Sequence, residues 1–255
     1  MISDLLKDSF SSAVDFDPLE AIRLKKEEML PVDYFDFYHS VSSVYSSKIE
    51  GENIDFDSFF KHKFLNVEYN PDYTKKSDDL FKAYQFVQKN PFTKENVFKV
   101  HSILSEHLLP ASQRGILRNN PMFVLNEDDR IEYVACEAKW VSSELDVFFE
   151  KAVTLLNADV SPVDAFFYAA HIHLSFVKIH PFQDGNGRTA RLLEKWFLIE
   201  KLGQDAVSIE LEKNYYLNRK DYYKNIRQIG LEYDTLDYSK GLDFLLMTIG
   251  SLKGS

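Results

Sequence analysis

The sequence predicts an all-α protein, mainly helical, with one small β-hairpin. Only 9 glycines and 8 prolines occur in 255 residues, too few for the many turns of a β-rich fold. Apolar side chains recur three and four residues apart along much of the chain, as on the buried face of a helix. Phenylalanine (21) and tyrosine (14) are abundant enough to fill a core between packed helices.

The N-terminal third is expected to form a helical lobe. Residues 1–33 are charged and mixed, and a helix is predicted over 34–50. Its apolar side chains follow the helical spacing at Tyr34, Phe37, Val41, Val44 and Tyr45. Gly51 comes directly afterwards and is a typical helix stop. The polar stretch 70–79 predicts a loop between this lobe and the rest of the chain.

The middle of the chain carries the hairpin. Thr93 is typical of a helix N-cap, and the helix that it begins should end before Pro110. Residues 122–134 contain two short apolar runs on either side of the acidic turn 126–129, a pattern that predicts a β-hairpin. Helix is expected to resume over 139–157.

Four more helices are predicted in the C-terminal part, over residues 161–178, 188–203, 213–229 and 238–252. The first has the clearest start, because Ser161 is a good cap, Pro162 suits the first helical position, and Asp164 places an acid in the first turn.

Composition excludes several classes of protein. Thirty basic and forty acidic residues give a net charge of −10, which repels phosphate backbones, so nucleic acid is not an expected partner. No apolar run reaches the roughly 18 residues of a membrane span, and the N-terminus does not have the pattern of a signal peptide. The single cysteine, Cys136, cannot form an intrachain disulfide and is expected to be buried. We therefore expect a cytoplasmic protein.

A glycine-rich loop between two of the predicted helices carries the candidate chemistry. It reads HPFQDGNGRTAR over residues 180–191. Pro181 disfavours helical geometry at His180, so the imidazole should lie at the mouth of the loop. Gly185 and Gly187 let the backbone turn sharply and approach a ligand closely.

The loop leads into a helix N-terminus, which is an anion-binding site. Arg188 and Arg191 lie in its first turn, where cations are unfavourable unless they meet an anion such as a polyphosphate. Asp184 offers a hard oxygen ligand for Mg²⁺, and His180 can accept a proton near neutral pH. Base, metal ligand and phosphate-binding groups together predict a phosphoryl-type transfer site. The loop is neither a P-loop nor a dinucleotide fingerprint, because no Gly-Lys-Ser/Thr follows and no βαβ pattern surrounds it.

This loop resembles the signature of the Fic (filamentation induced by cAMP) family, His-Pro-Phe-x-Asp-Gly-Asn-Gly-Arg-x-x-Arg, at every defining position. The resemblance extends back to residues 115–118 and the hairpin and forward to the tyrosine-rich helix. It implies a helical Fic catalytic domain over residues 93–230. An N-terminal helical region (1–92) would precede it, and a C-terminal helix (231–255) would pack on it.

The resemblance also implies an activity, the transfer of AMP from ATP to a serine, threonine or tyrosine hydroxyl of a protein. His180 would deprotonate the hydroxyl, Asp184 would bind Mg²⁺, and Arg191 would hold the γ-phosphate. The remaining nucleotide contacts would come from Gly185, Asn186, Gly187, Arg188, Tyr222 and Tyr223, the two tyrosines beside the adenine. The resemblance also places Gly230 at a nearby position that is Asn in some members of the family. Recognition of the adenine base can therefore differ in this chain. The hairpin (122–134) would align a strand of the target by backbone pairing, and the chain itself is one candidate target.

Residues 46–51, Ser46-Ser47-Lys48-Ile49-Glu50-Gly51, resemble the inhibitory motif of the family, Ser/Thr-x-x-x-Glu-Gly/Asn. The resemblance implies that Glu50 pairs with Arg191 and keeps it from the γ-phosphate. Ser46 and Gly51 are the other defining positions of this motif. The same residues permit another interpretation, in which Ser47 and Glu50 form a capping box before a helix at 53–60.

Several alternatives remain open from the sequence. Glu50 could instead direct a water that removes AMP from a modified protein, or the domain could bind nucleotide without catalysis. His171 and His173 are expected in the core or as support for the site, and His101 and His107 at the surface or in the core. Two roles are open for the N-terminal lobe, a homodimer contact or a surface for a partner.

Overall fold

The computed structural model describes residues 2–26, 29–125 and 131–253. They form twelve α-helices and one two-stranded antiparallel sheet, so the prediction of a mainly helical fold with one hairpin is confirmed. The helices are α1 (Lys7–Ser12), α2 (Pro18–Lys26), α3 (Tyr34–Ile49), α4 (Phe56–Leu65), α5 (Pro71–Lys89), α6 (Lys94–Leu104), α7 (Val141–Asn157), α8 (Pro162–Ile179), α9 (Asn186–Leu202), α10 (Leu211–Leu217), α11 (Arg219–Gln228) and α12 (Leu242–Gly250). The strands are β1 (Phe123–Leu125) and β2 (Ile131–Val134).

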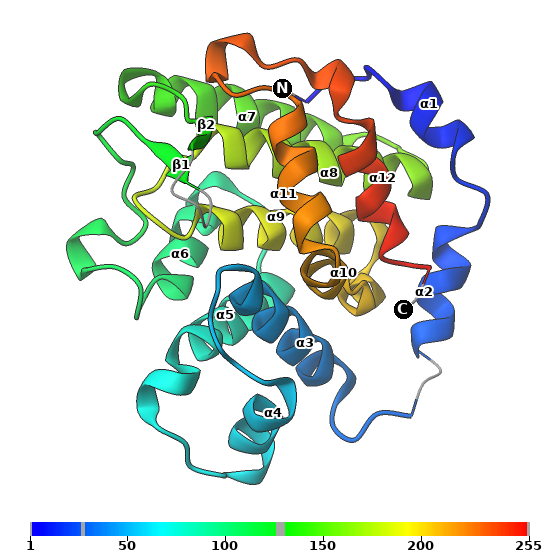
Figure 1. Cartoon of the computed structure of the whole chain (residues 1–255). Coiled ribbons are helices and arrows are strands. Elements are labelled where there is room, and N and C mark those ends of the chain that lie inside the picture. Colours follow the sequence, from blue (N-terminus) through cyan, green and yellow to red (C-terminus); the bar gives the residue numbers. More distant parts are fainter. Residues whose placement is uncertain (1, 27–28, 126–130, 254–255) are drawn as a thin grey trace.

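Helices α8 and α9 form the centre of the molecule and pack against each other (Figure 1). Every residue of α8 from Ala165 to Ile179 is buried, because α7, α9 and α12 cover it on different sides. Trp196 on α9 is the largest buried side chain and contacts Phe92 at a ring-centroid distance of 5.2 Å. The loop that joins α8 to α9 therefore starts and ends on rigid elements. None of the described helices is long and apolar enough to cross a bilayer.

Helix α3 packs between α5 and α10, and α4 packs on it from the outside (Figure 1). The helix predicted over residues 34–50 is thus present as α3, which ends one residue earlier than expected. Asp33 caps α3 by accepting hydrogen bonds from the amides of Phe35 and Asp36. Gly51 follows the helix with a φ of 86°, the left-handed conformation that favours glycine at a helix end.

The buried face of α3 is unusually polar, because five of its serines are buried. They are Ser40, Ser42, Ser43, Ser46 and Ser47. Ser42 accepts a hydrogen bond of 2.5 Å from Lys195 of α9, and that ammonium also pairs with Glu212 of α10 at 2.7 Å. Polar contacts as well as apolar packing therefore fix α3 against α9 and α10.

The hairpin lies beside the end of α8. Its strands pair in antiparallel register, Phe123 opposite Val134 and Leu125 opposite Ile131. The amide of Val134 donates to the carbonyl of Leu231 at 2.8 Å, which fixes the base of the hairpin to the segment after α11. The predicted acidic turn 126–129 lies outside the described residues.

Four predictions about the elements need correction. Residues 70–79 are not a loop, because Asn70 caps α5 and Pro71 stands at its start. The tyrosine-rich segment 213–229 is divided between α10 and α11, which Asn218 separates. The last helix, α12, covers Leu242–Gly250 and is shorter than the predicted range of 238–252. The capping box at Ser47 is wrong, because Ser47 lies inside α3 and the next helix is capped by Asp55.

Candidate active site

The loop between α8 and α9 begins with a residue in an unusual backbone conformation. His180 has φ 53° and ψ 60°, a left-handed geometry that costs a non-glycine residue free energy. Its amide donates to the carbonyl of Phe176 at 2.9 Å and closes the helix. The prediction that Pro181 takes His180 out of helical geometry agrees with this arrangement.

The His180 imidazole is held as a neutral base. Its Nδ1 lies 3.2 Å from the carbonyl oxygen of Val177 and 3.1 Å from the hydroxyl of Tyr133. A carbonyl can only accept, so we assign the proton to Nδ1, which leaves the lone pair on Nε2. Burial lowers the pKa of His180 to about 4; Arg118 also lowers it, whereas the Val177 carbonyl and Glu50 raise it. The ring is therefore unprotonated at Nε2 at neutral pH.

Arg118 fixes the backbone on both sides of His180. It is buried, and its guanidinium donates to the carbonyls of His180 at 2.6 Å and Ile179 at 3.2 Å. The same side chain donates to Asn120 and Cys136 near the two ends of the hairpin. One arginine thus joins the loop to the hairpin. The sequence assigned no role to Arg118 or to Tyr133, because their partners are distant in the chain.

The turn of the loop is closed by Asn186. Its side chain accepts from the amide of Phe182 at 2.9 Å and donates to the carbonyl of the same residue at 2.8 Å. The Phe182 ring stacks on His101 of α6, with 3.6 Å between ring centroids. His101 Nδ1 accepts from the amide of Gly115, so its Nε2 donates to the carbonyl of Asp184 at 2.9 Å. His101, expected only at the surface or in the core, supports the loop.

We expect Asn186→Ala to lower the free energy of unfolding by about 2–4 kcal/mol, because two buried backbone groups of Phe182 lose their partners. Urea denaturation measures this change. Gln183→Ala is the matched control, since none of the side-chain hydrogen bonds found in the described part of the chain involves Gln183. Equal losses in the two variants would contradict this role for Asn186.

The N-terminus of α9 has the properties of an anion site. Gly185 precedes it with a φ of 77°, and no side chain caps the helix. The first-turn amides are therefore left for a ligand. A Cβ at Gly187 would lie 2.6 Å from Oε1 of Glu50, so this glycine permits the close approach of that carboxylate. Asp184 is exposed and its Oδ1 accepts from the amide of Gly185 at 2.6 Å.

Arg191 is enclosed by partners from α3 and α11. Its guanidinium donates to the hydroxyl and the carbonyl of Ser46, at 2.9 and 3.2 Å, and to the hydroxyl of Tyr222 at 3.1 Å. Its Nη2 also lies 2.6 Å from Oε1 of Glu50. Burial alone would lower the pKa of Arg191, but Tyr222 and Glu50 outweigh it and raise the pKa above its ordinary value.

The carboxyl group of Glu50 is ionised in its pair with Arg191. Burial alone would raise the pKa of its carboxyl group, but the charges of Arg191 and Arg188 outweigh that effect and hold the pKa below its usual value. Arg188, the other arginine of the loop, lies 3.3 Å from Glu52. Each of the two loop arginines thus contacts a carboxylate from the segment that follows α3.

A buried chain of hydrogen bonds supports Arg191 from behind. The Tyr222 hydroxyl lies 3.0 Å from Nε2 of His173, and Nδ1 of His173 lies 2.6 Å from Glu194. His173 is therefore a core residue that also supports the site, as expected. Tyr222 is only 1% exposed, whereas Tyr223 is partly exposed and its hydroxyl donates to the carbonyl of Ile49. Of the two tyrosines, Tyr223 is therefore the more exposed.

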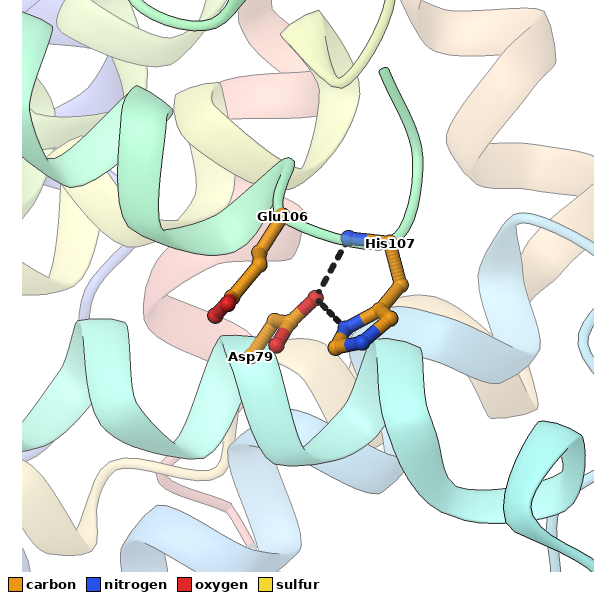
Figure 2. A group of neighbouring side chains, drawn as sticks. All are labelled: Asp79, Glu106 and His107. Carbon is orange, nitrogen blue, oxygen red and sulfur yellow. Dashed lines mark hydrogen bonds and ion pairs between the residues drawn. The ribbon is translucent and has the colours of Figure 1, made fainter. Parts of the chain in front are cut away.

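A second group of ionisable side chains joins α5 to the end of α6 (Figure 2). The buried Asp79 accepts from the amide of His107 at 2.8 Å and lies 2.8 Å from its Nδ1. Lys82 lies 3.5 Å from the other oxygen of Asp79 and 3.3 Å from Glu106. Because Lys82 forms ion pairs with Asp79 and Glu106, and His107 hydrogen-bonds to Asp79, we interpret this group as a structural polar cluster.

Comparison with known proteins assigns part of the chain to a family. Residues 91–198 match the model of the Fic/DOC family. A protein adenylyltransferase Fic from Nematostella vectensis is 29% identical over 143 residues, 56% of this chain and 30% of that protein. One of the same name from Drosophila willistoni is 32% identical over 141 residues, 54% of this chain and 24% of that protein. The chain thus spans about a quarter to a third of the length of these relatives.

Solved structures share the fold. A Fic family protein from Desulfovibrio desulfuricans superimposes with a TM-score of 0.73 and 16% identity, covering 99% of this chain and 73% of that one. Fic-1 from C. elegans (residues 134–508) gives a TM-score of 0.62 and 18% identity, covering 97% of this chain and 68% of that one. The family model, the sequence relatives and the fold agree in assigning residues 91–198 of this chain to a Fic domain.

Proposed function

We propose that this protein transfers AMP from ATP to a hydroxyl side chain of a protein and releases pyrophosphate. The observation that carries the proposal is the arrangement of a neutral His180 beside an uncapped helix N-terminus that bears two arginines. The relatives named protein adenylyltransferase Fic support the same reaction.

The chain's own groups suit each step of this reaction. The triphosphate would bind at the first turn of α9, with Arg188 and Arg191 on its negative oxygens. Nε2 of His180 would accept the proton of the target hydroxyl as its oxygen attacks the α-phosphorus. The bond from the α-phosphorus to the bridging oxygen breaks, and pyrophosphate leaves with the electron pair.

Asp184 fits the Mg²⁺ that such a reaction requires. It is an exposed carboxylate at the loop, and Mg²⁺ prefers one or two carboxylates together with phosphate oxygens and water. When bound, Mg²⁺ supplies positive charge to the phosphates. The loop holds Asp184 through the amide of Gly185, and His101 holds its carbonyl.

The hairpin is the proposed docking site for the target. Among the described residues, β1 pairs only with β2, so its outer edge can accept an added strand. Phe123, Leu125 and Ile131 on the hairpin are about half exposed and offer apolar contacts beside that edge. The target segment would be an extended strand that carries its hydroxyl residue toward His180.

Glu50 is proposed to inhibit this reaction. Its carboxylate holds Arg191 at 2.6 Å and places negative charge where the γ-phosphate would bind. Ser46 fixes the same guanidinium through its hydroxyl and carbonyl. Nucleotide could then bind only without the contact that aligns its γ-phosphate.

Position-specific labelling of ATP tests the proposal. The Glu50→Gly variant should label protein in a cell lysate, or itself, from ATP labelled at the α-phosphorus but not from ATP labelled at the γ-phosphorus. Equal labelling from both positions would contradict AMP transfer. Release of AMP from labelled protein only when Glu50 is present would indicate the reverse reaction as well. Nucleotide binding without any labelling would instead favour a binding module.

The lowered pKa of His180 predicts an unusual titration. Because Nε2 stays unprotonated down to about pH 4, the ring signals of His180 should not shift between pH 5.5 and 8. An ordinary histidine, with a pKa of about 6.5, would lose about 30-fold of its base form by pH 5. NMR titration of the histidine rings measures this, and His180→Asn assigns the signal. A midpoint near 6.5 would overturn the prediction.

A further inference from the structure

We propose that Glu52 is a second inhibitory carboxylate, which restrains Arg188 as Glu50 restrains Arg191, and that Lys76 limits its strength. The inference extends the proposed function, because Arg188 is one of the two arginines expected to hold the triphosphate. Glu52 lies outside the six residues that resemble the inhibitory motif, and the sequence pointed to no role for it.

The backbone presents both carboxylates to the same helix end. Gly51 adopts its left-handed conformation between them, and the amides of Glu50 and Glu52 both donate to the carbonyl of Ser47 at 3.1 Å. These bonds fix the segment to the last turn of α3. Glu50 then reaches Arg191 and Glu52 reaches Arg188, which lie in the first turns of α9.

Arg188 needs an anion in this position. Its side chain is 4% exposed, and its Nε has no hydrogen-bond partner among the described residues. A buried guanidinium at a helix N-terminus is doubly unfavourable, because it is desolvated and it opposes the helix dipole. Within the described ranges, Glu52 at 3.3 Å is the one carboxylate that forms an ion pair with Arg188. A phosphate and Glu52 would therefore compete for the same guanidinium.

Lys76 makes this restraint weaker than that of Glu50. Its Nζ lies 2.6 Å from the same Oε1 of Glu52, closer than Arg188 does. When a phosphate takes Arg188, Glu52 keeps a cationic partner and no carboxylate is left unpaired. Removing Lys76 should therefore strengthen the hold of Glu52 on Arg188, while removing the charge of Glu52 should release it.

The test measures ATP affinity in the Glu50→Gly background, so that the ion pair between Glu50 and Arg191 is absent from every protein compared. Isothermal titration with ATP and Mg²⁺ should show about two- to fivefold tighter binding for Glu52→Gln, a size typical of a partly exposed ion pair. Lys76→Met should weaken binding by about twofold or more for the same reason. Glu68→Gln is the matched control, an exposed glutamate for which the described part of the chain shows no ion pair, and it should leave the affinity unchanged.

The outcomes separate this inference from the proposed function. If Glu52→Gln binds ATP no more tightly than the Glu68→Gln control, Glu52 is not inhibitory. If Lys76→Met tightens binding, Lys76 does not limit Glu52 as proposed. If affinities follow the expected order but no variant transfers AMP, the role of Glu52 stands and the proposed reaction fails. If none of the variants binds ATP, both are wrong.

Discussion

Replacing Glu50 by glycine should raise the rate of AMP transfer by about 10²–10³-fold, somewhat below the 10³–10⁵-fold that an arginine can contribute to phosphoryl transfer. The change frees Arg191 from the contact at 2.6 Å and removes a negative charge from the proposed γ-phosphate site. Glu50 stands just after α3 with a φ of −82°, so glycine can adopt the same backbone. The rate at which α-labelled AMP appears on protein measures the effect.

Glu50→Gln is the matched control, because it keeps a hydrogen-bond acceptor near Arg191 but loses the charge. It should give an intermediate rate. Mild acidification should not raise the rate of AMP transfer as these substitutions do. The lowered pKa keeps Glu50 ionised at neutral pH, and the ion pair with Arg191 is lost only as the pH falls through that lowered value. A Glu50→Gly protein no faster than the wild type would remove the inhibitory role.

Local signals in the sequence predicted those elements whose ends are set by nearby residues. Thr93 accepts from the amide of Asn96, and Ser161 accepts from that of Asp164, as helix caps do. The hairpin at 122–134 was predicted from two apolar runs around an acidic turn, and the helix that begins at residue 34 was predicted from its apolar spacing. In each case the residues that decide the structure lie within a few positions of one another.

The errors have physical reasons as well. Asn70 and Pro71 begin α5 with the same combination of cap and proline as Ser161 and Pro162, but the polar stretch around them favoured a loop. That polarity is compatible with a helix, because Asp72 is exposed while the buried Ser77 and Asp79 have hydrogen-bond partners in Ser47 and the amide of His107. The break at Asn218 carries no proline or glycine, so periodicity alone could not reveal it.

The candidate site likewise contains residues that could be predicted from the sequence and residues that could not. The loop 180–191 is continuous in sequence, so its glycines, arginines and histidine could be recognised together. Arg118 and Tyr133 reach His180 across 62 and 47 residues, and His101 reaches Asp184 across 83. No spacing predicts such contacts, because they depend on how α6, α8 and the hairpin pack. Glu52 was close to a recognised motif, but only the structure places it beside Arg188.

Replacing His180 by alanine in the Glu50→Gly background should reduce AMP transfer by at least ~10²–10⁴-fold, the range typical of a removed general base. The imidazole belongs to the first residue of the loop, and its Nε2 is unprotonated at neutral pH. Without it, the target hydroxyl must lose its proton to water. Single-turnover labelling with α-labelled ATP measures the loss.

Two further measurements show whether the loss reflects the base or damage to the loop. Asn186, His101 and Arg118 hold the loop through backbone groups that alanine at position 180 retains. ATP affinity of the His180→Ala protein should therefore stay within about threefold of its parent, since such contacts do not involve the imidazole. His62→Ala, which removes a histidine on α4 far along the chain from the loop, should transfer AMP at the parental rate. Transfer by His180→Ala within tenfold of its parent would mean that another group accepts the proton.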